Sequence, residues 1–179
     1  IISGETALAV APADTDEFLV SDAGTLKRID YSLIKASNTP AFYVQRTANV
    51  TGSSDNTLTK LTWNAEVLDT NSAFASEKFT VPSGEDGKYF FSTSPYIKTD
   101  SAAGSTIQII FYKNGSAILA NQWYSNNNNH HYTERQVTHS ILLDLAATDY
   151  IEVYAKFNVS SSTWGSYATG SFFGYKLLI

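Results

Sequence analysis

The sequence predicts an all-β fold, in which an antiparallel sandwich follows a short N-terminal β-hairpin segment. The chain of 179 residues is 43% apolar but only 16% charged. Soluble domains are typically about 25% charged, so Ser, Thr, Asn and Tyr must cover much of this surface. From Ala41 onward, short segments alternate apolar and polar residues and end at Gly, Asn, Asp, Ser or Pro. This alternation is typical of antiparallel strands, and helical periodicity is almost missing there.

The first part of the chain, residues 1–38, predicts a hairpin and a linker. Strands are expected at 18–21 and 26–30, with a turn on Asp22-Ala23-Gly24 between them and one turn of helix after Asp30. A lone hairpin is marginally stable in water, so we expect it to lean on copies of itself, on the larger part or on a partner.

The second part, residues 41–179, begins after Asn38-Thr39-Pro40 and predicts the sandwich. Asn114-Gly115 is the dipeptide that best accepts the two positive φ angles of a type I′ turn, so it predicts a tight hairpin. Candidate strands cover residues 41–46, 57–63, 78–81, 87–97, 106–113, 116–124, 136–145, 150–157 and 171–179.

Strand periodicity assigns side chains to the two faces of the sheets. The side chains expected to face the core are Ile107, Ile109, Phe111, Ile151, Val153, Ala155 and Phe157. Tyr150, Glu152, Tyr154 and Lys156 are expected to face outward, and Tyr89 is assigned to the same outward class. Exposed tyrosines of this kind indicate burial against another surface, although a tyrosine on a strand also tolerates solvent.

Several motifs occur in a fixed order along residues 41–179. The first is the series Trp63, Asp69, Phe74, Phe79, Gly87, Tyr89 and Phe91, and it is followed by IIFYKNGSAI, LAATDYIEVYA and SFFGYKLLI. Together they resemble the complement C-one-q globular head family, a jelly-roll group related to tumour necrosis factor. The spacing between Phe74 and Gly87 differs from the family pattern, and Thr93 stands where an aromatic residue is usual, so the resemblance is to a divergent relative. On this interpretation Gly84 to Gly87 is a turn that folds the domain, with Phe79 and Phe90 or Phe91 filling the sandwich.

The resemblance implies a ten-stranded antiparallel jelly roll assembled as a homotrimer, with ligands bound at apical loops or subunit clefts. The expected interface residues are Tyr89, Tyr150, Tyr154 and His139. The family often holds calcium with apical carboxylates, for which the candidates are Glu85, Asp86, Asp144 and Asp149. Solvated turn acids are the better interpretation of these carboxylates, because nothing like an EF-hand ladder of oxygen ligands occurs, so no metal site is assigned to them.

The phrase TDEFLVSDAGTLKRIDYSLI in the first part is similar to short segments of bacteriophage virion proteins. Such segments often precede a trimeric fibre or tail-tip domain. The resemblance implies that residues 1–38 link the sandwich to other virion proteins or to a trimer stem.

The run QWYSNNNNHHYTER is the longest stretch of the second part without strand character, and we expect an apical loop there. Aromatic side chains stack on sugar rings and amides bond hydroxyl groups, so the loop is a candidate ligand site. Its candidate residues are Trp123, Tyr124, Asn126, Asn127, Asn128, Asn129, His130, His131 and Tyr132. A solvated hairpin loop is the alternative interpretation.

Composition and motifs also exclude several classes of function. The net charge of −5 repels phosphate backbones and anionic lipid, so neither nucleic acid nor a membrane is expected as a partner. The sequence contains no cysteine, nucleophile elbow, zinc-type His pair or phosphate loop, so we expect no enzyme, no catalytic residue and no cofactor.

The leading hypothesis is a non-enzymatic bacteriophage protein of the tail, fibre or capsid surface that attaches to a host glycan or outer-membrane component. One alternative is a structural or decoration protein of the virion that recognises no host. Another is a secreted C-one-q-like ligand or lectin-like module of a cellular organism.

Overall fold

A computed structural model describes residues 8–35, 37–99, 106–124, 134–159 and 163–178, and for 119–124 it describes the backbone alone. The chain divides into two units, Ile1–Ser37 and Asn38–Ile179. Among the described residues, no helix is both long and apolar enough to cross a bilayer.

The first unit is built on a β-hairpin. Strands β1 (Glu17–Asp22) and β2 (Thr25–Asp30) pair antiparallel, and a 3-10 turn, η1 (Tyr31–Leu33), follows. The two residues between the strands, Ala23 and Gly24, both have positive φ (48° and 83°), as a tight hairpin of right-twisted strands requires. The hairpin, its turn and the following helical turn agree with the sequence prediction to within a residue or two.

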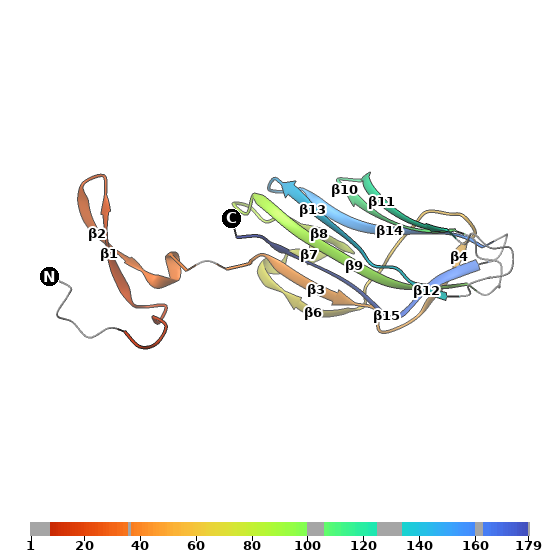
Figure 1. The fold of residues 1–179 in the computed structure, drawn as a ribbon, viewed down its shortest axis with the longest axis horizontal. Helices are drawn as coiled ribbons and strands as arrows, with labels where there is room; N and C mark the ends of the chain where they lie inside the picture. Colours follow the sequence, from red (N-terminus) through yellow and green to blue (C-terminus); the bar gives the residue numbers. More distant parts are fainter. Residues whose placement is uncertain (1–7, 36, 100–105, 125–133, 160–162, 179) are drawn as a thin grey trace. The chain divides into compact units, whose positions relative to one another are not determined.

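The second unit is an antiparallel sandwich of two sheets (Figure 1). One sheet contains β11 (Ser116–Tyr124), β10 (Thr106–Lys113), β14 (Tyr150–Asn158), β8 (Lys78–Thr80), β7 (Phe74–Ala75) and β5 (Thr59–Lys60). The other contains β12 (Glu134–Gln136), β13 (His139–Leu145), β9 (Gly87–Thr99), β15 (Thr163–Lys176), β3 (Ala41–Gln45), β4 (Val50–Ser54) and β6 (Ala65–Asp69). A short 3-10 segment, η2 (Thr70–Ser72), follows β6. The predicted jelly-roll sandwich is confirmed, and its strands are more numerous than ten because short pieces such as β5 and β7 pair separately.

Aromatic rings fill the space between the two sheets. Phe42, Phe79 and Phe172 are at most 2% exposed, and the Phe42 ring centroid lies 4.8 Å from that of Phe172 and 5.1 Å from that of Phe79. The predicted inward-facing residues of β10 and β14 are confirmed: Ile107, Ile109, Phe111, Ile151, Val153, Ala155 and Phe157 are all 0–2% exposed. These large side chains bury a substantial apolar area, and the chain contains no cysteine that could add a disulfide.

The glycine-rich turn between β8 and β9 carries the chain from one sheet to the other. Gly84 has φ +79° and Gly87 has φ +146°, both in the region that favours glycine. The Tyr89 hydroxyl donates a hydrogen bond of 2.6 Å to the Glu85 carbonyl, which fixes the end of the turn. The prediction that this stretch folds the domain is therefore confirmed.

The predicted Asn114-Gly115 turn joins β10 to β11, with φ angles of 51° and 78°. The observed β15 is longer than predicted, because it begins at Thr163 instead of Ser171. Strands β4 and β6 were not predicted.

Candidate functional site

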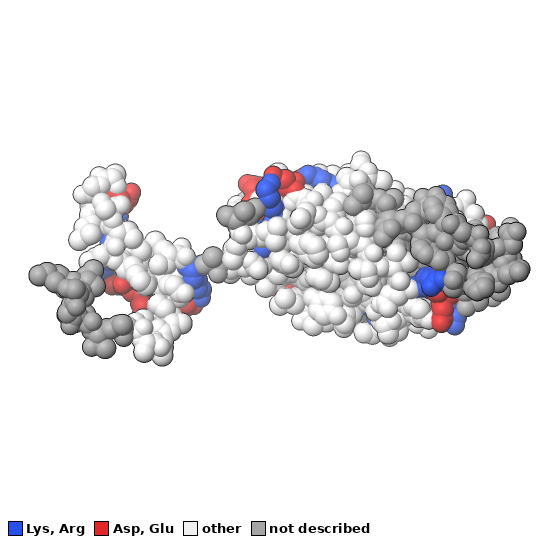
Figure 2. All heavy atoms as spheres, in the orientation of Figure 1, with Lys and Arg blue, Asp and Glu red and all other residues white. Residues whose placement is uncertain are grey.

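The outer face of the seven-stranded sheet carries a row of large apolar side chains. It consists of Tyr43, Leu68, Phe90, Leu142, Phe173 and Tyr175, and it is called the aromatic band below. Figure 2, drawn in the orientation of Figure 1, shows few charged side chains over the middle of the sandwich, where β9 and β15 lie. None of the side chains of the band is charged.

Strand register explains why these side chains lie together. Phe90 on β9 pairs with Leu142 on β13 and with Tyr175 on β15. On the next rung, Tyr43 on β3 pairs with Phe173 on β15 and with Leu68 on β6. Residues that face each other across neighbouring strands point to the same side of the sheet, so five strands contribute to one apolar strip.

The aromatic band is packed within itself but open to solvent. The Phe90 ring lies 5.6 Å from that of Tyr175, and the Tyr43 ring lies 6.2 Å from that of Phe173. Leu142 is 63% exposed and Leu68 is 48% exposed. A shallow groove of about 370 Å³ runs along Tyr43, Leu68, Phe173 and Tyr175. An exposed apolar strip of this kind makes the aromatic band a candidate interaction surface.

The structure corrects the predicted interface at Tyr89. Its side chain is 0% exposed and packs against Phe79 (5.5 Å between ring centroids) and Phe91 (6.0 Å). Burial, with Glu85 and Asp86 nearby, raises the pKa of its hydroxyl. The prediction that Tyr89 faces outward is wrong, because its neighbour Phe90 takes the outward position on β9.

His139 also lies on the core side of its strand. It is 9% exposed and its ring centroid lies 5.0 Å from that of Phe111. This position leaves little of its surface for another chain, so His139 does not belong to the aromatic band. The His139 ring therefore contributes to the packing of the sandwich through its contact with Phe111.

Tyr150 and Tyr154 face outward as predicted, on the six-stranded sheet. Lys78 places its ammonium 4.3 Å from the centre of the Tyr150 ring, and the Tyr154 ring lies 4.3 Å from that of Tyr112. Between them, Glu152 forms an ion pair of 2.6 Å with Lys60. Both tyrosines and Glu152 already have partners within the chain, and a role at a subunit interface stays a prediction for Tyr150 and Tyr154.

The predicted ligand loop falls largely outside the described residues. Trp123 and Tyr124 belong to the backbone of β11, where Tyr124 pairs with Thr106 of β10. Outside the described residues lie Asn126, Asn127, Asn128, Asn129, His130, His131 and Tyr132.

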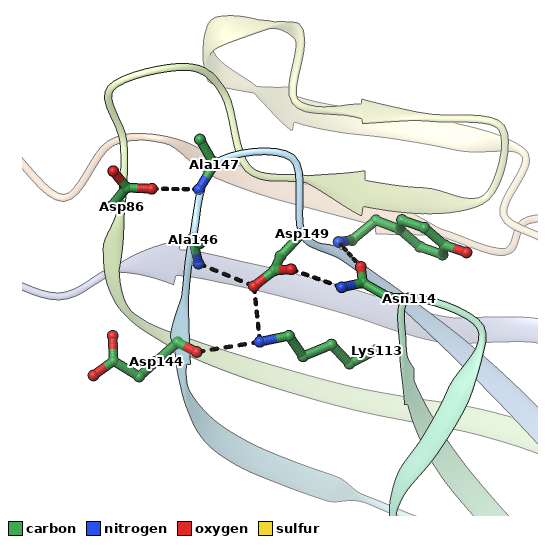
Figure 3. Close-up of polar contacts among 8 residues, drawn as sticks. Asp86, Lys113, Asn114, Asp144, Ala146, Ala147 and Asp149 are labelled. Carbon is green, nitrogen blue, oxygen red and sulfur yellow. Dashed lines mark hydrogen bonds and ion pairs between the residues drawn. The ribbon is translucent and has the colours of Figure 1, made fainter.

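The acidic residues considered for calcium lie at one end of the sandwich and bind groups of the protein (Figure 3). Asp149 accepts hydrogen bonds from the Asn114 side chain (2.6 Å) and the Ala146 amide (3.0 Å), and it forms an ion pair of 2.7 Å with Lys113. The Lys113 and Asn114 hydrogen bonds, followed by that from Ala146, lower the pKa of Asp149 to about 2. In this structure the Asp149 carboxylate is thus neutralised by the Lys113 ammonium.

The other apical carboxylates are also engaged. Asp86 accepts a hydrogen bond from the Ala147 amide, Asp144 pairs with Lys88 at 2.7 Å, and Glu85 pairs with Lys176 at 3.0 Å. Within the described part of the chain, no three His, Cys, Asp or Glu side chains form a group suited to a metal ion. These contacts tie the apical turns together.

Comparison with solved structures identifies the class of fold. The globular domain of the zebrafish complement 1qA protein is 16% identical, with a TM-score of 0.52, over 78% of this chain and 98% of that one. The Eiger tumour necrosis factor of S. frugiperda is 14% identical, with a TM-score of 0.53, over 77% of this chain and 92% of that one. No protein-family model and no curated protein matches the sequence. The chain therefore has the jelly-roll sandwich of the complement C-one-q and tumour necrosis factor globular domains, as the sequence motifs indicated.

Sequence reasoning missed the aromatic band. Adjacent aromatic pairs, Phe90-Phe91 and Phe172-Phe173, place one ring in the core and one ring outside. A pair of adjacent aromatic residues in a strand is the available signal, because alternation forces one of them outward.

Proposed function

We propose that the chain forms a homotrimer through the aromatic band and serves as a non-enzymatic attachment module on a bacteriophage virion. The observation that carries the proposal is the uncharged aromatic band, which runs across five strands of the seven-stranded sheet. The similarity of residues 1–38 to virion segments supports the phage setting, and the jelly-roll fold supports a recognition role. On this proposal the first unit joins other virion proteins and the sandwich meets the host surface.

Burial of the aromatic band is the physical reason for assembly. Apolar surface removed from water contributes about 25 cal/mol per Å². In a trimer with threefold symmetry, each copy is rotated by 120° relative to the next. The aromatic band of one copy then contacts a different surface of the next copy, and three such contacts close the ring. The trimer has a net charge of −15 (3 × −5), which opposes association, and an uncharged contact surface minimises that repulsion.

Sedimentation of the full chain and two variants tests the assembly. Leu142→Glu places a carboxylate in the aromatic band at an exposed position, so we expect it to shift the trimer to monomer at micromolar concentration. Ile118→Glu is the control on the six-stranded sheet, because Ile118 is an exposed apolar residue outside the aromatic band, and we expect this variant to remain a trimer. A monomeric wild type, or dissociation by Ile118→Glu alone, contradicts the use of the aromatic band.

Binding experiments with the purified trimer test the attachment role. We expect it to bind host cells and to block infection by competing with the virion. A trimer that binds virions but neither binds cells nor blocks infection is instead a structural or decoration protein. A gene located among those of a cellular organism, without capsid, portal or tail genes beside it, favours a secreted ligand or lectin-like module.

A further inference from the structure

A second surface feature, a polar cleft on the six-stranded sheet, lies apart from the aromatic band. The cleft has a volume of about 180 Å³, and the described residues that line it are Asn56, Thr106, Gln108, Lys156 and Asn158. All of these side chains are polar, three of them are amides, and one is charged. This composition differs from that of most small-molecule pockets, which are mainly apolar.

Strand pairing fixes the floor of the cleft. Thr106 pairs with Asn158 and Gln108 pairs with Lys156 across β10 and β14. The residues between them, Ile107 and Phe157, are 0% and 2% exposed and anchor the same rungs in the core. Four polar side chains therefore project from a rigid part of the sheet.

The wall of the cleft comes from the turn after β4. Asn56 has φ 50°, a left-handed conformation that asparagine tolerates. Its backbone N–H donates a hydrogen bond of 2.8 Å to the Phe157 carbonyl. The neighbouring Asp55 turns one carboxylate oxygen toward the Val159 amide at 2.7 Å. The Asp55 carboxylate thus binds a backbone N–H group, while Asn56 lines the cleft.

Lys156 differs from the other lysines of the described chain. Each of the others has a carboxylate within 4 Å, except Lys78, which stands over the Tyr150 ring. Lys156 has neither kind of partner among the described residues, although it is half-buried in a chain with a net charge of −5. A lysine that shares a cleft with three amide side chains and has no carboxylate beside it favours an anionic ligand.

We infer that this cleft binds a saccharide unit that carries a carboxylate. The inference rests on the proposed function, because an attachment module needs a surface that recognises the host. Amides offer both donors and acceptors to neighbouring hydroxyl groups, and the ammonium pairs with the carboxylate. The volume is smaller than the about 300–1,000 Å³ of drug-sized pockets, so the cleft accepts one sugar ring. Three copies in a trimer raise the strength of binding to a repetitive glycan by about 10² to 10⁴.

NMR titration of the full chain with methyl β-D-glucuronide, methyl β-D-glucoside and acetate tests this inference. We expect the glucuronide to bind about tenfold more tightly than the glucoside, since a hydrogen bond to a charged group is the stronger one. Acetate is expected to bind more weakly than the glucuronide, because it lacks hydroxyl groups. Equal binding of both sugars, or acetate binding as tightly as the glucuronide, overturns the inference.

Variants separate the cleft from the rest of the surface. Lys156→Gln replaces the ammonium with a neutral amide, so we expect it to abolish the preference for glucuronide while leaving the melting temperature unchanged. Lys88→Gln, an exposed lysine outside the cleft, is the matched control and should keep the preference. An unchanged preference in Lys156→Gln overturns the inference.

The same titration distinguishes this inference from the trimer proposal. Leu142→Glu should bind the single sugar with an unchanged dissociation constant even as a monomer. A wild type that is monomeric but prefers the glucuronide supports the cleft and removes the trimer. A trimeric wild type that prefers neither sugar removes the cleft and leaves the trimer standing.

Discussion

At the scale of single residues, Asp149 shows how one carboxylate organises an end of the sandwich. It joins the turn between β10 and β11, through Lys113 and Asn114, to the turn before β14, through the Ala146 amide. Asn114 completes the link by accepting a hydrogen bond of 2.9 Å from the Tyr150 amide. The side chain of Asp149 is only 16% exposed, so solvent screens these contacts incompletely.

Replacement of this carboxylate is expected to change the dependence of stability on pH. The pKa of Asp149 in the folded protein, about 2, lies below its value of about 3.9 in an unfolded chain. Its contribution is therefore present above about pH 4 and lost as the pH falls through about 2. We expect Asp149→Asn to lower the free energy of unfolding by about 1–2 kcal/mol at pH 7. Thermal melting between pH 7 and pH 2 should show the difference from wild type shrinking as the pH falls.

Asp144→Asn is the matched control for this prediction. Its ion pair with Lys88 is exposed on both sides (73% and 53%), so the change should alter stability by less than about 1 kcal/mol. A difference between wild type and Asp149→Asn that stays constant from pH 7 to pH 2 would mean that the carboxylate contributes nothing through its charge.

At the scale of elements, β15 depends on a glycine. Gly174 pairs with Phe91 on one side and with Phe42 on the other. A Cβ at position 174 would lie 2.4 Å from one carbon of the Phe91 ring and 2.9 Å from the Phe90 carbonyl oxygen. The missing side chain thus provides the space that the buried Phe91 ring occupies, which explains the aromatic-Gly-aromatic motif of this strand.

Gly174→Ala is expected to destabilise the sandwich by about 1–3 kcal/mol, because overpacking forces the Phe91 ring or the backbone to move. Denaturant unfolding of the variant measures the loss. Ser171→Ala in the same strand adds no atom and should change stability little. In a Phe91→Leu background, Gly174→Ala should lower the free energy of unfolding by less than it does in the wild type, because leucine leaves more room for the added methyl group. Additive effects of the two changes would refute the contact as the cause.

The sequence predicted elements where alternation is strong and missed them where it is weak. Strands β10 and β14 follow a period of two with Ile, Val and Phe inside, and their faces were assigned correctly. Strand β4 reads VTGSS, and the first half of β15 reads TWGSYATG, so small polar residues conceal the strand pattern there. Tyr89 was assigned to the wrong face because adjacent aromatic residues in β9 fit either register, and burial alone decides between them.

At the scale of the whole molecule, the outward side chains of the two sheets differ in their contacts. On the six-stranded sheet, ion pairs and ring contacts join outward side chains such as Glu152 and Tyr154, and Lys156 in the polar cleft has neither kind of contact among the described residues. The seven-stranded sheet leaves the aromatic band open. Adjacent aromatic pairs in the sequence show that single rings point outward, but they do not show that these rings form one band, because its residues come from five strands whose neighbours are set by the fold.

The division into two units leads to a last prediction. Every member of the hydrophobic core, from Phe42 to Phe172, belongs to the unit Asn38–Ile179. The side chains of β1 and β2 are nearly all exposed, so the hairpin contributes no comparable core.

We expect a chain that starts at Asn38 to keep the melting temperature of the full chain and, because it retains the aromatic band, to remain a trimer in sedimentation. The same chain should fail to join virions, since it lacks the segment proposed to attach there. Leu142→Glu in the full chain should show the opposite loss, with the hairpin present and the trimer dissociated. A fall in the melting temperature of more than a few degrees on truncation would show that the hairpin unit supports the sandwich directly.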